Sequence, residues 1–383
     1  MEFLNERINS IKWDKTDVFY GKKDLLPLWV ADMDIKSPKE LLDNLNELTK
    51  KGDFGYTFKG EDFYKSISLW YEKRYGVSIH PKKIIGAQGV VHSISMLIEI
   101  FSNIDDEIII QSPIYPPFFK IINALKRKVV FNSLCRSNKE YSIDFYKLEK
   151  SITNKTKILL LCNPHNPTGK VFSIEELKKL EEICKKNNIL IISDEIHGDL
   201  VYQKKHKPFF SISDWAKENS IILNSPAKTF NCPSLLVSYL IVGNLEYKKK
   251  IKTYMEIRHL GEINSFGLEG IKTLYNKCDY WLNELLELLE ENYLFIESYL
   301  SNKLPKIEFT RPQGTYLIWL NFEKYNLPYE KLEEIFVNDC NLALSRGSDF
   351  GIEGQGFMRL NFGTSKKILK EALERIYMVF SKF

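Results

Sequence analysis

The feature of this sequence that most restricts its fold is an alternation of short apolar runs with amphipathic segments. The runs are rich in Ile and Val, and most are followed by Gly, Pro, Asn or Asp, which is typical of buried strands. An amphipathic segment begins with a capping box at Ser173 and Glu176 and places Leu177 and Leu180 on one face. The alternation predicts an α/β fold with a mostly parallel sheet covered on both faces. The predicted strands lie at residues 84–87, 107–111, 128–131, 157–162, 188–193, 220–224 and 238–242.

The last part of the chain has a different pattern. A long helical stretch from about residue 265 to 300 leads into the segments IEFT, TYLIWLNF, YEKLEEIFVNDC, LALS and FMRLNF and a final helix. This order indicates a smaller α+β domain. We therefore expect an N-terminal segment at 1–45 that packs on the small domain or a dimer partner, a large domain at 46–275 and a small domain at 276–383.

Two residues at the ends of predicted strands give the first chemical signal. Asp194 and Lys228 each follow an apolar run and are 34 residues apart (228 − 194), room for one crossover helix and one strand. Ligands of such sheets bind at the carboxyl ends of the strands. Singly, Asp194 is best interpreted as a turn aspartate and Lys228 as a surface lysine. Together they are the pair that pyridoxal 5′-phosphate (PLP) needs, a lysine for a Schiff base and an acid that keeps the pyridine nitrogen protonated.

Two more segments follow buried strands. NPHNPTG at 163–169 supplies Asn166, whose amide can donate a hydrogen bond to the phenolic oxygen of PLP; its alternative is a polar turn. PIYPPF at 113–118 supplies Tyr115, which can stack on the cofactor ring; its alternative is a tyrosine that covers the core at a Pro-rich turn.

A phosphate site is also predicted. The segment GAQGVV at 86–91 ends a strand and opens a helix, so the amides of Val90 and Val91 suit a phosphate group. Ser225, three residues before Lys228, adds a hydroxyl. Neither a Walker A loop nor a dinucleotide fingerprint is present.

Arg359 and His197 are the remaining candidates. Arg359 lies inside the apolar pattern GFMRLNF, where a guanidinium can hold a substrate carboxylate through two hydrogen bonds. An intramolecular salt bridge is its equal alternative. His197 lies three residues after Asp194 and is either near the cofactor or structural. The histidines show no metal-ligand spacing, so we expect no metal site.

Composition excludes several classes of protein. The net charge is only +4, with Lys and Glu interspersed, which disfavours nucleic acid binding. The 6 cysteines form no C-x-x-C pair, and no apolar run is long enough for a membrane span. The opening MEFLNERINS lacks the pattern of a signal peptide, so we expect a cytoplasmic protein.

Taken together, these segments resemble the fold-type I PLP enzymes of the aminotransferase class I/II superfamily. The similarity is greatest to the cystathionine β-lyase branch, the MalY/PatB-type carbon–sulfur lyases. The matching segments are KWDK at 12, PLWVADMD at 27, FGYT at 54, CNPHNPTG at 162, SDEIHGDL at 193, AKTFN at 227, TYLIWLNF at 315 and GFMRLNF at 356. They span nearly the whole chain.

The resemblance implies a role for each matching position. Lys228 is the Schiff-base lysine, and Asp194 is the partner of the pyridine nitrogen. The resemblance also implies a homodimer in which Tyr56 reaches the phosphate of the neighbouring subunit. The other implied cofactor contacts are Asn166, Tyr115, Ser225, Val90 and Val91, and the implied substrate contacts are Arg359, Asn166 and the region of Ala31.

Some positions depart from the pattern. Leu236 stands eight residues after Lys228 (236 − 228), where many aminotransferases have a phosphate-binding arginine. The segment SRG at 345–347 differs from the Pro-Gly usual in the lyases, so Arg346 lines the pocket or points to solvent.

The expected activity is PLP-dependent carbon–sulfur β-lysis of cystathionine or related cysteine S-conjugates, giving pyruvate, ammonia and a thiol. The first alternative is a PLP-dependent aminotransferase, which shares every step up to removal of the Cα proton. The second is a regulator that acts through a protein partner, since some proteins of this branch also bind a transcription factor. We expect the protein to bind neither nucleic acid nor a membrane.

Overall fold

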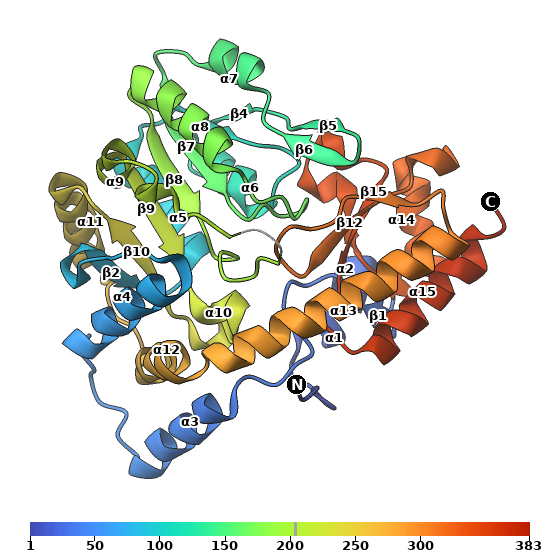
Figure 1. The fold of residues 1–383 in the computed structure, drawn as a ribbon, viewed down its shortest axis with the longest axis horizontal. Coiled ribbons are helices and arrows are strands. Elements are labelled where there is room, and N and C mark those ends of the chain that lie inside the picture. The colour runs from blue at the N-terminus through green and yellow to red at the C-terminus, as the bar shows by residue number, and fades with distance from the viewer. Residues whose placement is uncertain (203–204) are drawn as a thin grey trace.

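A computed structural model describes residues 1–202 and 205–383 of the chain. Its largest element is a seven-stranded sheet in the order β2-β10-β9-β8-β7-β3-β4 (Figure 1). The strands from β9 to β4 run parallel, whereas β10 is antiparallel to both of its neighbours. All of the predicted strands form, and the mostly parallel sheet is confirmed. Their bounds are β2 Ile84–Ala87, β3 Glu107–Ile110, β4 Lys128–Phe131, β7 Thr156–Cys162, β8 Leu190–Asp194, β9 Ser220–Asn224 and β10 Ser238–Val242.

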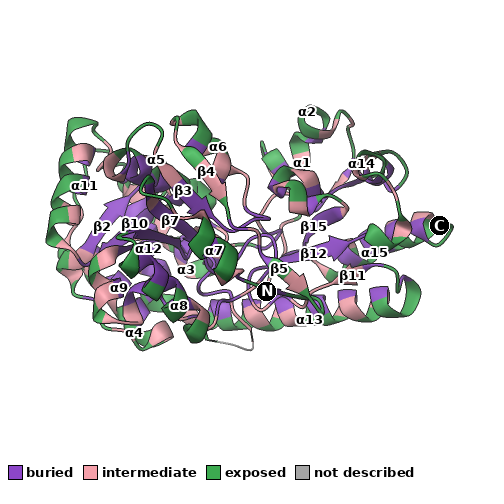
Figure 2. Ribbon diagram, turned by 90° about the horizontal axis from the view of Figure 1, so that it is seen from above, coloured by how far each residue is buried: buried purple, intermediate pink, exposed green. Residues whose placement is uncertain are grey.

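Helices cover both faces of this sheet because successive side chains of each strand point to opposite faces. Leu159 and Ile191 belong to one buried cluster, and Ile158 and Ile192 belong to the other. Figure 2 shows the result, with buried strands inside and helices whose outer faces are exposed. The first cluster is covered by α4 Glu61–Tyr75, α8 Ile174–Lys186, α9 Asp214–Asn219 and α12 Ser265–Lys277, and the second by α5 Val90–Phe101, α6 Pro117–Ala124 and α11 Leu245–Ile257.

The predicted capping box is confirmed at the start of α8. The Ser173 side chain accepts a hydrogen bond from the Glu176 amide, and the Glu176 carboxylate accepts one from the Ser173 amide. Both interactions satisfy amides that a helix N-terminus otherwise leaves unpaired. The shorter elements on this side of the molecule are α7 Phe145–Ser151, α10 Pro226–Thr229 and the hairpin of β5 Cys135–Ser137 and β6 Glu140–Ser142.

A second, antiparallel sheet has the strand order β11-β12-β15-β14. The long helix α13 Asp279–Lys303 runs from the large sheet to this smaller one in Figure 1. The expected α+β pattern of the C-terminal part is therefore present. Its elements are β11 Glu308–Phe309, β12 Leu317–Asn321, α14 Tyr329–Asn338, β13 Leu342–Ala343, β14 Ser345–Arg346, β15 Phe357–Asn361 and α15 Lys366–Phe380.

The N-terminal segment contains α1 Ile11–Asp14, α2 Thr16–Tyr20, β1 Leu26–Pro27 and α3 Lys39–Lys51. Strand β1 pairs in parallel with β13, which brings this segment to the C-terminal part of the chain. Helix α3 lies against α12 instead. The domain boundaries at residues 45 and 275 stay predictions. Within the described residues, no helix is both long enough and apolar enough to cross a membrane.

Candidate active site

A cavity of about 230 Å³ lies at the carboxyl ends of the parallel strands, where the sequence predicted a site. Asp194 ends β8, Asn166 follows β7 and Tyr115 follows β3. Ser225 and Lys228 follow β9 on the short helix α10. Of the predicted site residues, Ala31, Val90, Val91, Tyr115, Asn166, Asp194, His197, Ser225 and Lys228 line this cavity.

The Lys228 amine lies at the wall of the cavity. Its Nζ donates a 2.6 Å hydrogen bond to the carbonyl oxygen of Ala31. Burial lowers the pKa of Lys228 to about 8, although the charge of Asp32 opposes that shift. An amine with this pKa is partly neutral near pH 7, which a nucleophile and base requires. The interpretation of Lys228 as an ordinary surface lysine is therefore wrong.

Asp194 is a buried carboxylate without an ion-pair partner among the described residues. Its Oδ1 accepts a hydrogen bond from the amide of Ile196 at 3.1 Å. Burial raises the pKa of Asp194 to about 7, because the charged form loses its hydration. A buried acid in a cavity is a partner for a protonated ligand nitrogen, which supports the role predicted from the sequence.

His197 is buried beside Asp194, and its Nδ1 has no hydrogen-bond partner. Its ring packs edge-on against Tyr316, with the ring centroids 5.8 Å apart. Burial lowers the pKa of His197, so the imidazole is neutral and can either donate or accept a hydrogen bond. A buried nitrogen that has no hydrogen-bond partner at the wall of a cavity favours contact with a ligand over a purely structural role for His197.

Arg359 carries a positive charge into the same region from β15, and it is only 4% exposed. Its guanidinium donates to Asn166 Oδ1 at 2.8 Å, to the Trp29 carbonyl at 2.8 Å and to Ser345 Oγ at 2.9 Å. All three acceptors are neutral, and no carboxylate of the described residues pairs with it. The intramolecular salt bridge is therefore not formed. Burial lowers the pKa of Arg359 to about 10, which leaves it charged and without a counter-ion.

The predicted phosphate site lies at the start of α5. Val90 and Val91 are its first two residues, after Gly89 at the N-cap, so their amides precede the helical hydrogen bonds. Ser225 differs from expectation, because its hydroxyl donates to the Val237 carbonyl at 2.6 Å and accepts from the Ala227 amide. A contact between Ser225 Oγ–H and a phosphate requires the hydroxyl to turn, so that role stays a prediction.

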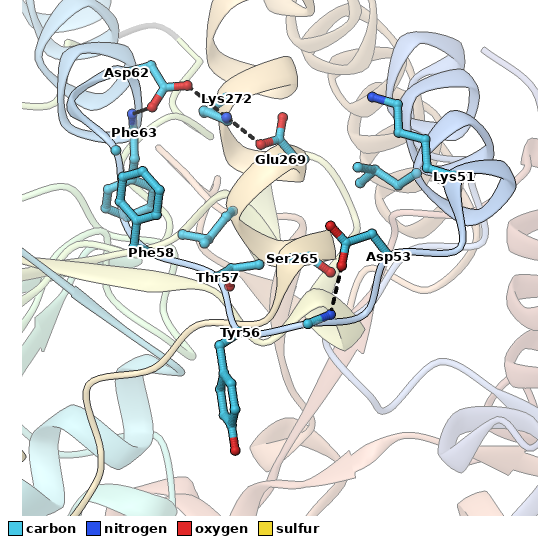
Figure 3. A pocket seen from close by; sticks show the side chains of 14 residues that line it. Lys51, Asp53, Tyr56, Thr57, Phe58, Asp62, Phe63, Ser265, Glu269 and Lys272 are labelled. Carbon is cyan, nitrogen blue, oxygen red and sulfur yellow. Dashed lines mark hydrogen bonds and ion pairs between the residues drawn. The ribbon is translucent and has the colours of Figure 1, made fainter.

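Two predicted site residues do not line this cavity: Arg359, which adjoins it through Asn166, and Tyr56, which lies away from it. Tyr56 is on the irregular segment between α3 and α4, and its side chain is fully exposed at 101%. Figure 3 shows Tyr56 pointing away from the ion pairs of Lys272 with Asp62 and Glu269. The structure therefore leaves Tyr56 available to a neighbouring subunit, and its role there stays a prediction.

Sequence reasoning missed Tyr316, whose hydroxyl donates to the Ala31 carbonyl at 2.7 Å. Tyr316 lies in the segment TYLIWLNF, just before β12, the strand that pairs with the strand of Arg359. That pairing was the available signal, but strand order cannot be read from periodicity. Arg346 does not line the cavity, and neither does Arg359, so whether Arg346 borders a substrate stays a prediction. Arg346 is 3.7 Å from Glu333 and stacks over the Tyr20 ring.

A family model, curated relatives and solved structures all match this chain over most of its length. The family model for aminotransferase class I and II matches residues 24–376. The chain is 37% identical to cystathionine beta-lyase PatB of Bacillus subtilis, over 97% of each chain. It is 30% identical to protein MalY of Escherichia coli, over 94% of this chain and 93% of that one. The crystal structure of cystalysin from Treponema denticola, which contains a pyridoxal 5′-phosphate cofactor, superposes with a TM-score of 0.96 at 29% identity, covering 100% of this chain and 98% of that chain.

Proposed function

The chain belongs to the aminotransferase class I and II family, and from that premise we propose that it is a PLP-dependent carbon–sulfur β-lyase. Its substrates are cystathionine or related cysteine S-conjugates, and its products are pyruvate, ammonia and a thiol. The observation that carries the proposal is the position of three groups: Lys228 and Asp194 line the cavity, and the guanidinium of Arg359, which has no counter-ion, adjoins it through a hydrogen bond to Asn166.

The cofactor is pyridoxal 5′-phosphate, and the groups at the cavity fit it. The carboxylate of Asp194 lacks a cation and suits the protonated pyridine nitrogen. The Nδ1 of His197 lacks any partner, and the amides at the start of α5 suit the phosphate. The residues that would hold the cofactor are Lys228, Asp194, Asn166, Tyr115, His197, Ser225, Val90 and Val91, with Tyr56 supplied by a partner subunit.

When bound, PLP links to the substrate amine and accepts the electron pair that remains when the Cα proton is removed. The Lys228 amine, partly neutral near pH 7, takes that proton as the general base. Arg359 holds the substrate carboxylate, which supplies the counter-ion that the guanidinium lacks in this chain. Asp194 keeps a negative charge opposite the ring nitrogen, and Asn166 and the Ala31 backbone border the substrate.

Two features favour lysis over transamination. The curated relatives reported above include a protein named cystathionine beta-lyase. Leu236 lines the cavity where many aminotransferases have a phosphate-binding arginine, as the resemblance implies. Loss of the thiolate from Cβ needs no second substrate, whereas an aminotransferase must return a proton to the cofactor and then accept an oxo acid.

The enzyme acts as a homodimer in the cytoplasm. Support for the dimer comes from the segment between α3 and α4, where Phe54, Tyr56 and Phe58 are all exposed. Solvent-exposed aromatic groups in such a cluster are characteristic of protein interfaces. Support for the cytoplasm comes from the cysteines, all of which are free thiols.

The test is incubation of the purified protein with cystathionine and no added 2-oxo acid. We expect sustained production of pyruvate, ammonia and homocysteine in equal amounts. A single turnover that resumes only when 2-oxoglutarate is added would instead identify an aminotransferase. Negligible turnover with any cysteine thioether, together with capture of a protein partner, would favour the regulator.

A further inference from the structure

Four charged side chains, two buried and two partly buried, form a cluster in the N-terminal part of the chain. Lys12 is fully buried, and its Nζ lies 2.7 Å from Asp34 Oδ2 and 3.9 Å from Asp32 Oδ1. Arg7 donates two hydrogen bonds to the carboxylate of Asp32, at 3.0 and 2.7 Å. Two cations thus balance two carboxylates, which is what makes burial of these charges tolerable.

The turn that carries Ala31 adjoins the cluster through Asp32. Asp32 is the next residue in the chain, and the Ala31 carbonyl accepts hydrogen bonds from Lys228 Nζ at 2.6 Å and Tyr316 at 2.7 Å. The Asn361 amide donates to the carbonyls on either side, Val30 O at 2.7 Å and Asp32 O at 2.6 Å. The backbone of this turn and the side chain of Asp32 are therefore both held in place beside Lys228.

Charged groups from three elements act on the Lys228 amine. Burial is the main influence on its pKa and lowers it; Asp32 of the N-terminal turn and Asp194 of β8 raise it, and Arg359 of β15 lowers it. Asp32 has the largest effect of these charges. Asp34, in the same cluster, is not among the groups that affect Lys228. The neutral groups near this amine are the Tyr316 phenol, which shares its acceptor, and the His197 imidazole.

We propose that Asp32, held by Arg7 and Lys12, is a positioning residue: it anchors the turn whose Ala31 carbonyl accepts the hydrogen bond of the Lys228 amine, and it places a carboxylate next to that turn. The inference rests on the proposed role of Lys228 as the general base. It gives the N-terminal segment a part in proton transfer without any contact between that segment's carboxylates and the substrate.

The test measures the proton affinity of Lys228 in the full-length, cofactor-free protein. Trace acetic anhydride is applied across a range of pH, and acetylation of the peptide that contains Lys228 is quantified by mass spectrometry. Asp32→Asn removes a negative charge near the amine, so the labelling midpoint should fall by about one pH unit. Asp34→Asn removes one negative charge from the same cluster and serves as the control. The labelling midpoint of Lys228 should move less than half as far in this variant as in Asp32→Asn, even if the variant unfolds at a lower temperature.

Arg7→Met extends the test in case Asp32→Asn does not fold, which circular dichroism would reveal. Loss of the Arg7 cation leaves Asp32 less compensated, so the labelling midpoint should rise. An unchanged midpoint in folded Asp32→Asn or in Arg7→Met would overturn the inference, as would equal shifts in Asp32→Asn and Asp34→Asn. No turnover is measured, so such a result leaves the proposed function standing, whereas attachment of the cofactor to another lysine would overturn that function.

Discussion

Arg359 Nη1 donates a 2.8 Å hydrogen bond to Asn166 Oδ1, which joins the smaller sheet to the carboxyl edge of the larger one. The two residues have different proposed ligands, since Arg359 holds the substrate carboxylate and Asn166 faces the phenolic oxygen of the cofactor. Because the guanidinium also orients the amide, a change at Arg359 should affect both ligands. With the proposed roles, this contact couples substrate binding to cofactor binding.

The first prediction concerns Arg359→Met. Loss of a charge-assisted hydrogen bond to the substrate carboxylate should cost about 1.5–3 kcal/mol and raise KM about tenfold to a hundredfold. The dissociation constant for PLP should also rise, because Asn166 loses a donor. Arg346→Met is the matched control, since that arginine already pairs with the Glu333 carboxylate and should leave KM unchanged. Equal effects in both variants would contradict the proposed role of Arg359.

The second prediction concerns cofactor attachment. Borohydride reduction of the PLP-loaded protein should fix the cofactor on the peptide that contains Lys228, the amine with the lowered pKa at the cavity. Lys228→Ala should bind PLP weakly without turnover, whereas Lys120→Ala, a change at an exposed residue of α6, should behave as the unchanged protein. Recovery of the reduced cofactor on a different lysine would contradict the central assignment.

The third prediction is a trade between stability and function at Asp194. Folding raises the pKa of this carboxyl to about 7 by burial, so its ionisation destabilises the cofactor-free chain increasingly as pH rises from about 4 to 7. Asp194→Asn removes that penalty. Its free energy of unfolding, relative to the unchanged protein, should therefore increase by about 2–3 kcal/mol between pH 5 and pH 8.

Urea unfolding of both cofactor-free proteins at the two pH values gives this difference. Comparison of the two proteins cancels other titrating groups, such as His165, whose pKa burial lowers to about 4. Addition of PLP should make the unchanged protein the more stable of the two, because the neutral side chain of asparagine cannot form an ion pair with a protonated ring nitrogen. A difference that does not change with pH would show that Asp194 is already ionised in the folded chain.

Much of the large sheet could be predicted because buried parallel strands are continuous apolar runs, as at 157–162 and 220–224. The antiparallel direction of β10 could not be predicted, because a strand has the same apolar periodicity in either direction. Asp194 and Lys228 were singled out because Asp194 directly follows such a run and Lys228 lies four residues (228 − 224) after one. The contacts of Asp32 and Lys12 were not found, because an ion pair between the one-turn helix α1 and an irregular segment leaves no periodic signal.

The motifs predicted which residues lie at the site better than they predicted the hydrogen bonds those residues make. The role given to Ser225 assumed a free hydroxyl, but that hydroxyl donates a hydrogen bond to the Val237 carbonyl. Such an acceptor comes from a backbone group across the turn, which the sequence around Ser225 does not reveal. Tyr316 was quoted within a motif but given no role, because its contact with Ala31 depends on how the N-terminal segment packs on the smaller sheet.

The last prediction concerns the exposed segment that carries Tyr56. If the Tyr56 hydroxyl completes the phosphate site of a partner subunit, Tyr56→Phe should weaken PLP binding by about 1.5–3 kcal/mol, the value of a hydrogen bond to a charged group. Fluorescence titration of the cofactor measures this change. Tyr146→Phe, a variant of an exposed tyrosine on α7, is the control and should bind PLP normally. Because the other phosphate contacts come from the same chain as Lys228, PLP affinity should also fall when the protein is diluted below the dimer dissociation constant. Light scattering that shows only monomers at micromolar concentration, with PLP bound at full affinity, would contradict the shared site.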